Sequence, residues 1–164
     1  MWELIKYCGF ALAFVAAWSV SSGYDSFAKR RLSEYEAYLK LITHIEWALS
    51  VKGATVREWC EGYSDPVLDA LELLPLLRSG TPIKEAYQRS QKRSCASAEA
   101  KELLGELFNE YGNGYLSREL MKLKHTKEAL TKISECEAAV LTKNARLYRM
   151  LLFTGALGIV ILAL

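Results

Sequence analysis

The sequence predicts an all-α protein, in which a bundle of about five or six helices is flanked by an N-terminal and a C-terminal transmembrane helix. Three observations lead to this fold class. The chain has only three prolines, none after Pro82, and so few chain breakers favour long helices. Two uncharged segments lie near the ends of the chain. Between them, apolar residues recur at spacings of three and four, the period of an amphipathic helix.

The composition excludes several classes of protein. Of the 164 residues, 51% are hydrophobic and 24% are charged, which is typical of a folded domain and not of a disordered chain. The 21 Lys and Arg residues nearly balance the 19 Asp and Glu residues. A nucleic-acid partner is therefore not expected, because such binders carry a clear basic excess. The cysteines, Cys8, Cys60, Cys95 and Cys136, have no metal-binding or redox spacing and are expected to be small buried hydrophobes.

The two uncharged segments are the candidate membrane spans. Residues 7–24 form a stretch of 18 residues without a charge, and residues 150–164 form one of 15. A membrane helix needs about 20 predominantly apolar residues. The nine Leu, Ile, Val and Phe residues of the second stretch contribute on the order of −3 to −5 kcal/mol to insertion. The predicted organisation is a span in 1–28, a helical domain in 29–146 and a span in 147–164.

Basic residues flank both segments on the side of the central domain. They are Lys29, Arg30, Arg31, Lys143, Arg146 and Arg149. Cationic residues close to spans stay in the cytoplasm, so both groups place the central domain on the cytoplasmic side of the cell membrane. Three other interpretations remain open: the first segment as a cleaved signal peptide, the same segment as a buried core helix, and the second segment as a lone tail anchor.

Start and stop signals divide the first half of the central domain. An apolar stripe in 32–49 predicts a helix that ends near Gly53. Thr55 to Glu58 reads as a capping box that starts a short helix to about Tyr63. Asp65-Pro66 starts a helix that ends near Gly80, and Pro75 is expected to kink or break it.

The second half contains fewer breaks. Thr81-Pro82 is a further helix start, and an apolar pattern in 103–111 marks another helix. Gly112-Asn113-Gly114 is the strongest turn signal. Residues 117–164 lack proline, and a single helix of about 48 residues is expected there. The first helix is likewise expected to run on from the membrane, with a bend at Ser21-Ser22-Gly23 as the alternative.

The sequence shows no catalytic, cofactor-binding or metal-binding site. It contains no phosphate-binding loop and no nucleophile elbow. His44 and His125 have no other metal ligands arranged around them, and we interpret both as ordinary helix residues. Glu34 and Glu36 point to different faces of a helix, so we interpret them as solvated surface and not as an acid–base pair. The chain is therefore predicted not to be an enzyme and to need no cofactor.

One predicted helix is basic. It carries Arg118, Lys122, Lys124, Lys127 and Lys132. Such a helix can bind anionic lipid or an acidic partner. However, acidic residues lie among these cations and mute their field, so an ordinary solvated helix is the simpler interpretation.

Several short motifs resemble those of a known family. They are Leu39 with Ile45-Glu46, Glu85-Ala86-Tyr87, Tyr111-Gly112 followed by Ser117-Arg118-Glu119, and Lys143-Asn144 before the last apolar run. With the layout of the whole chain, they make it similar to the stage III sporulation protein AB family of endospore-forming bacteria. That family in turn resembles one helical domain of the F-type inner-membrane platform proteins of type II secretion and type IV pilus systems.

The resemblance implies a non-catalytic platform or scaffold subunit of a secretion-like complex that joins mother cell and forespore. The subunit would lie in the mother-cell membrane that faces the forespore. It would dock a cytoplasmic motor ATPase and contact other membrane subunits. A second interpretation is a small channel or transporter subunit, in which two spans from each of several copies line a pore.

Overall fold

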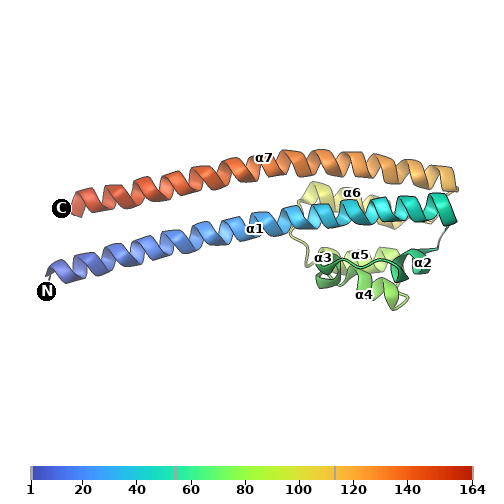
Figure 1. The fold of residues 1–164 in the computed structure, drawn as a ribbon, viewed down its shortest axis with the longest axis horizontal. Coiled ribbons are helices and arrows are strands. Elements are labelled where there is room, and N and C mark those ends of the chain that lie inside the picture. Colours follow the sequence, from blue (N-terminus) through green and yellow to red (C-terminus); the bar gives the residue numbers. More distant parts are fainter. Residues whose placement is uncertain (1, 54, 113, 164) are drawn as a thin grey trace. The chain divides into compact units, whose positions relative to one another are not determined.

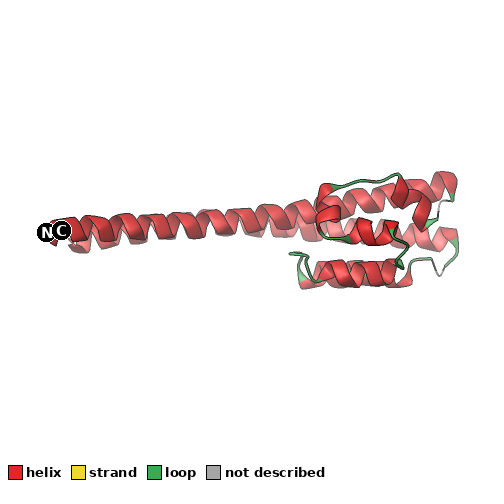
Figure 2. Ribbon diagram, turned by 90° about the horizontal axis from the view of Figure 1, so that it is seen from below, coloured by secondary structure: helices red, strands yellow, loops and turns green. Residues whose placement is uncertain are grey.

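The protein is almost entirely helical. The computed structural model describes the backbone of residues 2–53, 55–112 and 114–163, and Figure 1 gives the order of the helices. They are α1 (Trp2–Lys52), α2 (Val56–Glu61), α3 (Pro66–Ala70), α4 (Leu73–Arg78), α5 (Ile83–Gln91), α6 (Ala98–Glu110) and α7 (Leu116–Ala163). These segments contain helices, turns and loops but no strand (Figure 2). The all-α prediction is confirmed.

The chain folds as two compact units. Unit 1 consists of Met1–Lys29 together with Glu137–Leu164, and unit 2 consists of Arg30–Cys136. Both α1 and α7 therefore contribute residues to each unit. The five shorter helices belong to unit 2 alone.

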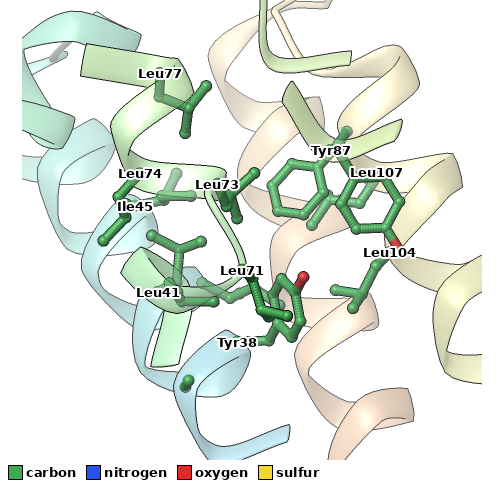
Figure 3. Packing of buried hydrophobic residues seen from close by; sticks show 14 of the residues in the cluster. Tyr38, Leu41, Ile45, Leu71, Leu73, Leu74, Leu77, Tyr87, Leu104 and Leu107 are labelled. Atoms are coloured by element: carbon green, nitrogen blue, oxygen red, sulfur yellow. The ribbon is translucent and has the colours of Figure 1, made fainter. Parts of the chain in front are cut away.

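The core of unit 2 is built from one face of α1 and the helices that pack on it. Tyr35, Tyr38, Leu41, Ile42 and Ile45 are buried at spacings of three and four, which brings them to the same side of the helix. Figure 3 shows Ile45 of α1 and Leu74 of α4 pointing into the same interior. Buried leucines of α6 and α7 complete the cluster. Each large apolar side chain contributes about 1.5–3 kcal/mol when it is fully buried.

The predicted helix starts are confirmed where side chains cap them. The amide of Thr55 donates to the carboxylate of Glu58 at 2.7 Å, which is one half of the predicted capping box. The Asp65 carboxylate accepts from the amides of Val67 and Leu68 at 2.9 and 3.3 Å. α2 and α3 begin directly after these caps.

The helix predicted to run from Asp65 to near Gly80 is divided into α3 and α4. The break lies at Glu72, whose φ of 63° is left-handed, three residues before Pro75. Proline cannot donate to the carbonyl four residues earlier, here Leu71, and its ring crowds that oxygen. The missing hydrogen bond therefore interrupts the helix one turn before the proline itself.

Each of the two long helices is a single element, as predicted. α1 is continuous through Ser21-Ser22-Gly23, and α7 has 48 residues, as expected. Within the residues described, no helix combines the length and the apolar content that crossing a bilayer requires. Most side chains of 7–24 and 150–164 lie outside the described part of the chain. The two flanking spans therefore remain a prediction.

The cysteines only partly follow the sequence interpretation. Cys60 is buried, Cys95 is half-buried and Cys136 is exposed. The expectation of a small buried hydrophobe is thus confirmed for Cys60 and wrong for Cys136. The side chain of Cys8 lies outside the described residues.

Candidate functional site

A shallow groove runs along α1 on a face distinct from its core face. Its lining consists of Leu39, Lys40, Thr43, His44 and Trp47. Trp47 is 50% exposed, although tryptophan side chains are highly buried on average. Partly exposed tryptophans in a groove are among the commonest anchors of protein interfaces.

Neighbouring groups hold the groove in shape. Nε2 of His44 lies 3.1 Å from the carbonyl oxygen of Trp59, and because a carbonyl only accepts, Nε2 carries the hydrogen. The His44 ring centroid lies 4.8 Å from that of Tyr63 and 6.1 Å from that of Trp47. Burial, followed by the nearby charge of Asp65, raises the pKa of Tyr63 to about 12, so this phenol is neutral at physiological pH. A wall fixed in this way costs little to order when a partner binds.

The rim of the groove carries one cation that a partner can use. Nζ of Lys40 lies 3.9 Å from the Glu36 carboxylate, and the two side chains are 66% and 70% exposed. Exposed pairs of this kind contribute little to stability. A carboxylate from a partner can therefore replace Glu36 at small cost, so the groove fits an apolar side chain with an acidic neighbour.

Glu34 is not part of the solvated surface, and that prediction is wrong for this residue. Its side chain is only 1% exposed. The carboxylate accepts from Ser94 Oγ at 2.7 Å and from the Cys95 amide at 2.9 Å, and Nε of Arg30 lies 3.7 Å away. The contacts with Ser94 and Cys95 bind the connection between α5 and α6 to α1, whereas the Arg30 pair lies within α1 itself. Glu34 is therefore a structural anchor.

Tyr35 continues this anchor at the start of α6. Its hydroxyl accepts from the amide of Ser97 at 3.0 Å and from Nε of Arg31 at 3.3 Å, and it donates to Ser97 Oγ at 3.2 Å. Ser97 Oγ in turn accepts from the Ala100 amide at 3.3 Å, which is the bond of a helix N-cap. α1 thus positions the residue that begins α6.

The six basic residues of the sequence prediction fall into separate groups. Arg30 and Arg31 belong to unit 2 and contact Glu34 and Tyr35. Three others, Lys29, Lys143 and Arg146, belong to unit 1 and are exposed. The side chain of Arg149 lies outside the described residues. The role of the six in setting a membrane topology remains a prediction.

Two tyrosines connect the two halves of unit 1. The ring centroids of Tyr24 and Tyr148 lie 5.2 Å apart, with planes inclined by 49°. Tyr24 closes the uncharged stretch 7–24, and Tyr148 lies two residues before the stretch 150–164. The two helical segments of unit 1 run antiparallel and side by side (Figure 1). The Tyr24 end of stretch 7–24 and the start of stretch 150–164 therefore lie at about the same height along the two helices.

Apolar exposure is concentrated in unit 1. Among the described residues, eight of the thirteen large apolar side chains that are exposed belong to this unit. They are Val15, Trp18, Phe27, Val140, Leu147, Tyr148, Met150 and Leu151. Soluble proteins rarely expose such a concentration of apolar surface, which marks contact with a partner or a membrane.

Acidic residues of other helices pair with cations of the basic helix and so reduce its positive field. Nζ of Lys122 lies 2.6 Å from the Glu110 carboxylate of α6, and Nζ of Lys127 lies 3.5 Å from that of Glu46 in α1. The hydrogen bond and charge of Lys122 lower the pKa of Glu110. The sequence pattern shows only the acidic neighbours along the same helix, because contacts between helices cannot be seen in a linear pattern.

In the part of the chain that the structure describes, no three His, Cys, Asp or Glu side chains come together in a way that could hold a metal ion. Neither a family model, nor a curated protein, nor a solved structure matches the chain. The groove on α1 and the exposed apolar side chains of unit 1 are the features of the described residues that bear on function.

Proposed function

We propose that the chain is a non-catalytic platform subunit of a membrane complex. In this proposal 1–28 and 147–164 anchor it in the cell membrane, and 29–146 forms a cytoplasmic domain that docks a motor ATPase. The single observation that carries the proposal is the contact between Tyr24 and Tyr148, with ring centroids 5.2 Å apart.

This contact matters because it brings the borders of two uncharged stretches to one level. Two spans that enter a bilayer side by side must cross the interface together, and tyrosine is enriched there because its ring is amphipathic. The exposed apolar side chains of unit 1, such as Trp18 and Leu151, would then face lipid. Lys29 and Lys143 lie on the polar side of the tyrosines along their helices, where cytoplasmic cations are expected.

The groove on α1 is the proposed binding site for the partner. Trp47 supplies an aromatic anchor and Lys40 supplies a cation, so the partner would present an apolar side chain beside a carboxylate. The resemblance to the stage III sporulation protein AB family suggests the cytoplasmic motor ATPase of a secretion-like complex between mother cell and forespore. Other membrane subunits of that complex, and further copies of this chain, would contact the anchored ends.

Membrane anchorage is tested by fractionation of cells that produce the full-length chain. We expect the protein to stay in the membrane pellet after an alkaline carbonate wash and to leave it only with detergent. Peripheral proteins are released by that wash because their attachment is electrostatic. Recovery of the full-length chain in the supernatant without detergent would overturn the proposal.

Docking is tested by co-purification with a secretion-type ATPase from the same cells. We expect Trp47→Ala to remove the ATPase from the detergent-purified complex, because it deletes the aromatic anchor. The matched control is Tyr115→Ala, which deletes an aromatic side chain that is 88% exposed and lies outside the groove. Equal recovery of the ATPase with both variants would show that the ATPase does not bind in the groove.

A further inference from the structure

We propose that unit 1 carries a belt of cations that binds the headgroups of anionic phospholipids. The belt consists of Lys29, Lys143 and Arg146. This inference rests on the proposed membrane anchorage and adds the class of lipid that the anchor prefers.

The tyrosine contact determines the height of each cation. An α-helix rises about 1.5 Å per residue, so Lys29, five residues after Tyr24, lies about 7.5 Å further along α1. Lys143, five residues before Tyr148, lies about 7.5 Å along α7 in the same direction, since the two segments run antiparallel. Arg146 lies about 3 Å from the tyrosine level on the same side. The three cations therefore occupy one thin layer next to the border of the uncharged stretches.

The same helix geometry determines where these cations point. Successive residues turn by about 100°, so Lys29 lies about 140° around α1 from Tyr24. Lys143 and Arg146 lie about 140° and about 160° around α7 from Tyr148. Because the two tyrosines face each other, the cations face outward from both helices, in agreement with their exposure. A single small anion cannot touch all three, whereas a surrounding layer of headgroups can.

The charges inside unit 1 leave this layer cationic. Within the described residues, none of the three cations takes part in an ion pair, whereas Arg30 of unit 2 is paired with Glu34. Asp25 is the one carboxylate next to the tyrosines in the sequence, and it is half-buried and already engaged in an interaction. Exposed cations at a membrane surface attract anionic lipid additively.

The test compares lipid selection by matched variants. The full-length protein is reconstituted into vesicles of phosphatidylcholine mixed with phosphatidylglycerol, re-extracted, and analysed for the lipids that remain bound. We expect phosphatidylglycerol to be enriched over its share in the vesicle. In Lys29→Gln/Lys143→Gln/Arg146→Gln, we expect the enrichment to fall by up to about fivefold for each cation removed. High salt should weaken the enrichment in the unsubstituted protein.

The control variant removes the same number of exposed cations from unit 2. Lys84→Gln/Lys92→Gln/Lys132→Gln has the same net charge as the test variant, and all three positions are exposed. It should keep the full enrichment. Equal loss of enrichment in both variants would show an effect of net charge and overturn the belt. Equal retention in both would overturn it as well.

Three further outcomes separate this inference from the proposed function. Displacement of bound phosphatidylglycerol by inorganic phosphate in the millimolar range would indicate a site for a free anion and would overturn a headgroup layer. A protein that stays in the vesicles through an alkaline wash but takes up both lipids equally would overturn the belt and leave the anchorage intact. Release from the vesicles by that wash would overturn the anchorage and the belt together.

Discussion

The carboxylate of Glu34 accepts the backbone amide of Cys95, with oxygens 2.9 and 3.1 Å from the nitrogen, across 61 residues of sequence. One residue further along α1, Tyr35 holds the N-cap of α6. The helix that carries the groove therefore also fastens the connection between α5 and α6. Because both features belong to one helix of unit 2, a change in the anchor also affects the support of the groove.

We expect Glu34→Ala to destabilise the protein by about 1–3 kcal/mol, because it removes a buried carboxylate and leaves the half-buried donors of Ser94 and Cys95 without their acceptor. Thermal or urea unfolding followed by circular dichroism measures the loss. Glu36→Ala is the matched control, since Glu36 is 70% exposed and pairs only loosely with Lys40. It should change stability by no more than about 0.5 kcal/mol. Similar losses in the two variants would contradict the anchor.

The sequence was sufficient to predict the helical elements wherever the signal is local. Asp65-Pro66 and the pair Thr55 and Glu58 start helices because a cap needs only residues two or three positions away. Pro75 was recognised as a breaker, but its effect falls at Glu72, one turn earlier. The alternative of a bend at Ser21-Ser22-Gly23 does not appear as a break in α1, since weak helix formers do not by themselves end a helix.

Two of the features that were missed depend on contacts between distant segments. Glu34 looked solvated because its position along α1 says nothing about the connection that covers it. The groove was missed because one of its lining residues, His44, is held by Tyr63, whose ring packs against it from a different part of the chain. Cys136 looked like a core residue by type alone, although it is exposed. Residue type predicts burial only on average.

Two buried tyrosines, Tyr38 and Tyr87, and two half-buried ones, Tyr63 and Tyr111, are expected to make the fold sensitive to alkali. Burial raises the pKa of Tyr63 and of Tyr111 to about 12, and burial also raises the pKa of Tyr38 and of Tyr87. In the unfolded chain a tyrosine loses its proton near pH ~10. The folded state holds these protons more tightly, so their stabilisation is complete below about pH 10 and is lost as the pH rises through about 12.

The measurement is a pH titration that follows tyrosinate absorbance and helical circular dichroism together. We expect a group of tyrosines that ionise only at high pH, and we expect their ionisation to coincide with the loss of helix. Tyr87→Phe removes one ionisable group and should move the loss of helix to higher pH. Its hydroxyl also donates to the Lys101 carbonyl at 2.8 Å, so the comparison is made relative to the stability of each variant at neutral pH. Complete tyrosine ionisation with the helix intact would contradict the expectation.

The cysteines give a direct test of the membrane topology. In single-cysteine variants, a water-soluble maleimide should modify the exposed Cys136 rapidly in a lysate. Cys60 should react only in denaturant, because it is buried and burial raises the pKa of its thiol. In intact cells an impermeant maleimide should leave Cys136 unmodified if the central domain is cytoplasmic. Modification of Cys136 from outside intact cells would overturn the proposed topology.

Two glycines should respond to alanine with opposite signs. Gly80 follows α4 with a φ of 86°, and the bonds from its amide to Leu77 O and from the Thr81 amide to Leu76 O, both 3.0 Å, form a Schellman cap. Alanine in this left-handed conformation costs about 1–2 kcal/mol.

Gly105 lies inside α6, where an added Cβ would meet only Tyr87 Cε1 at 3.7 Å, an ordinary contact. Gly105→Ala should therefore stabilise the protein by about 0.5–1 kcal/mol through helix propensity. Urea unfolding of the two variants measures both changes, and a loss of stability in Gly105→Ala equal to that in Gly80→Ala would show that backbone conformation is not what distinguishes the two sites.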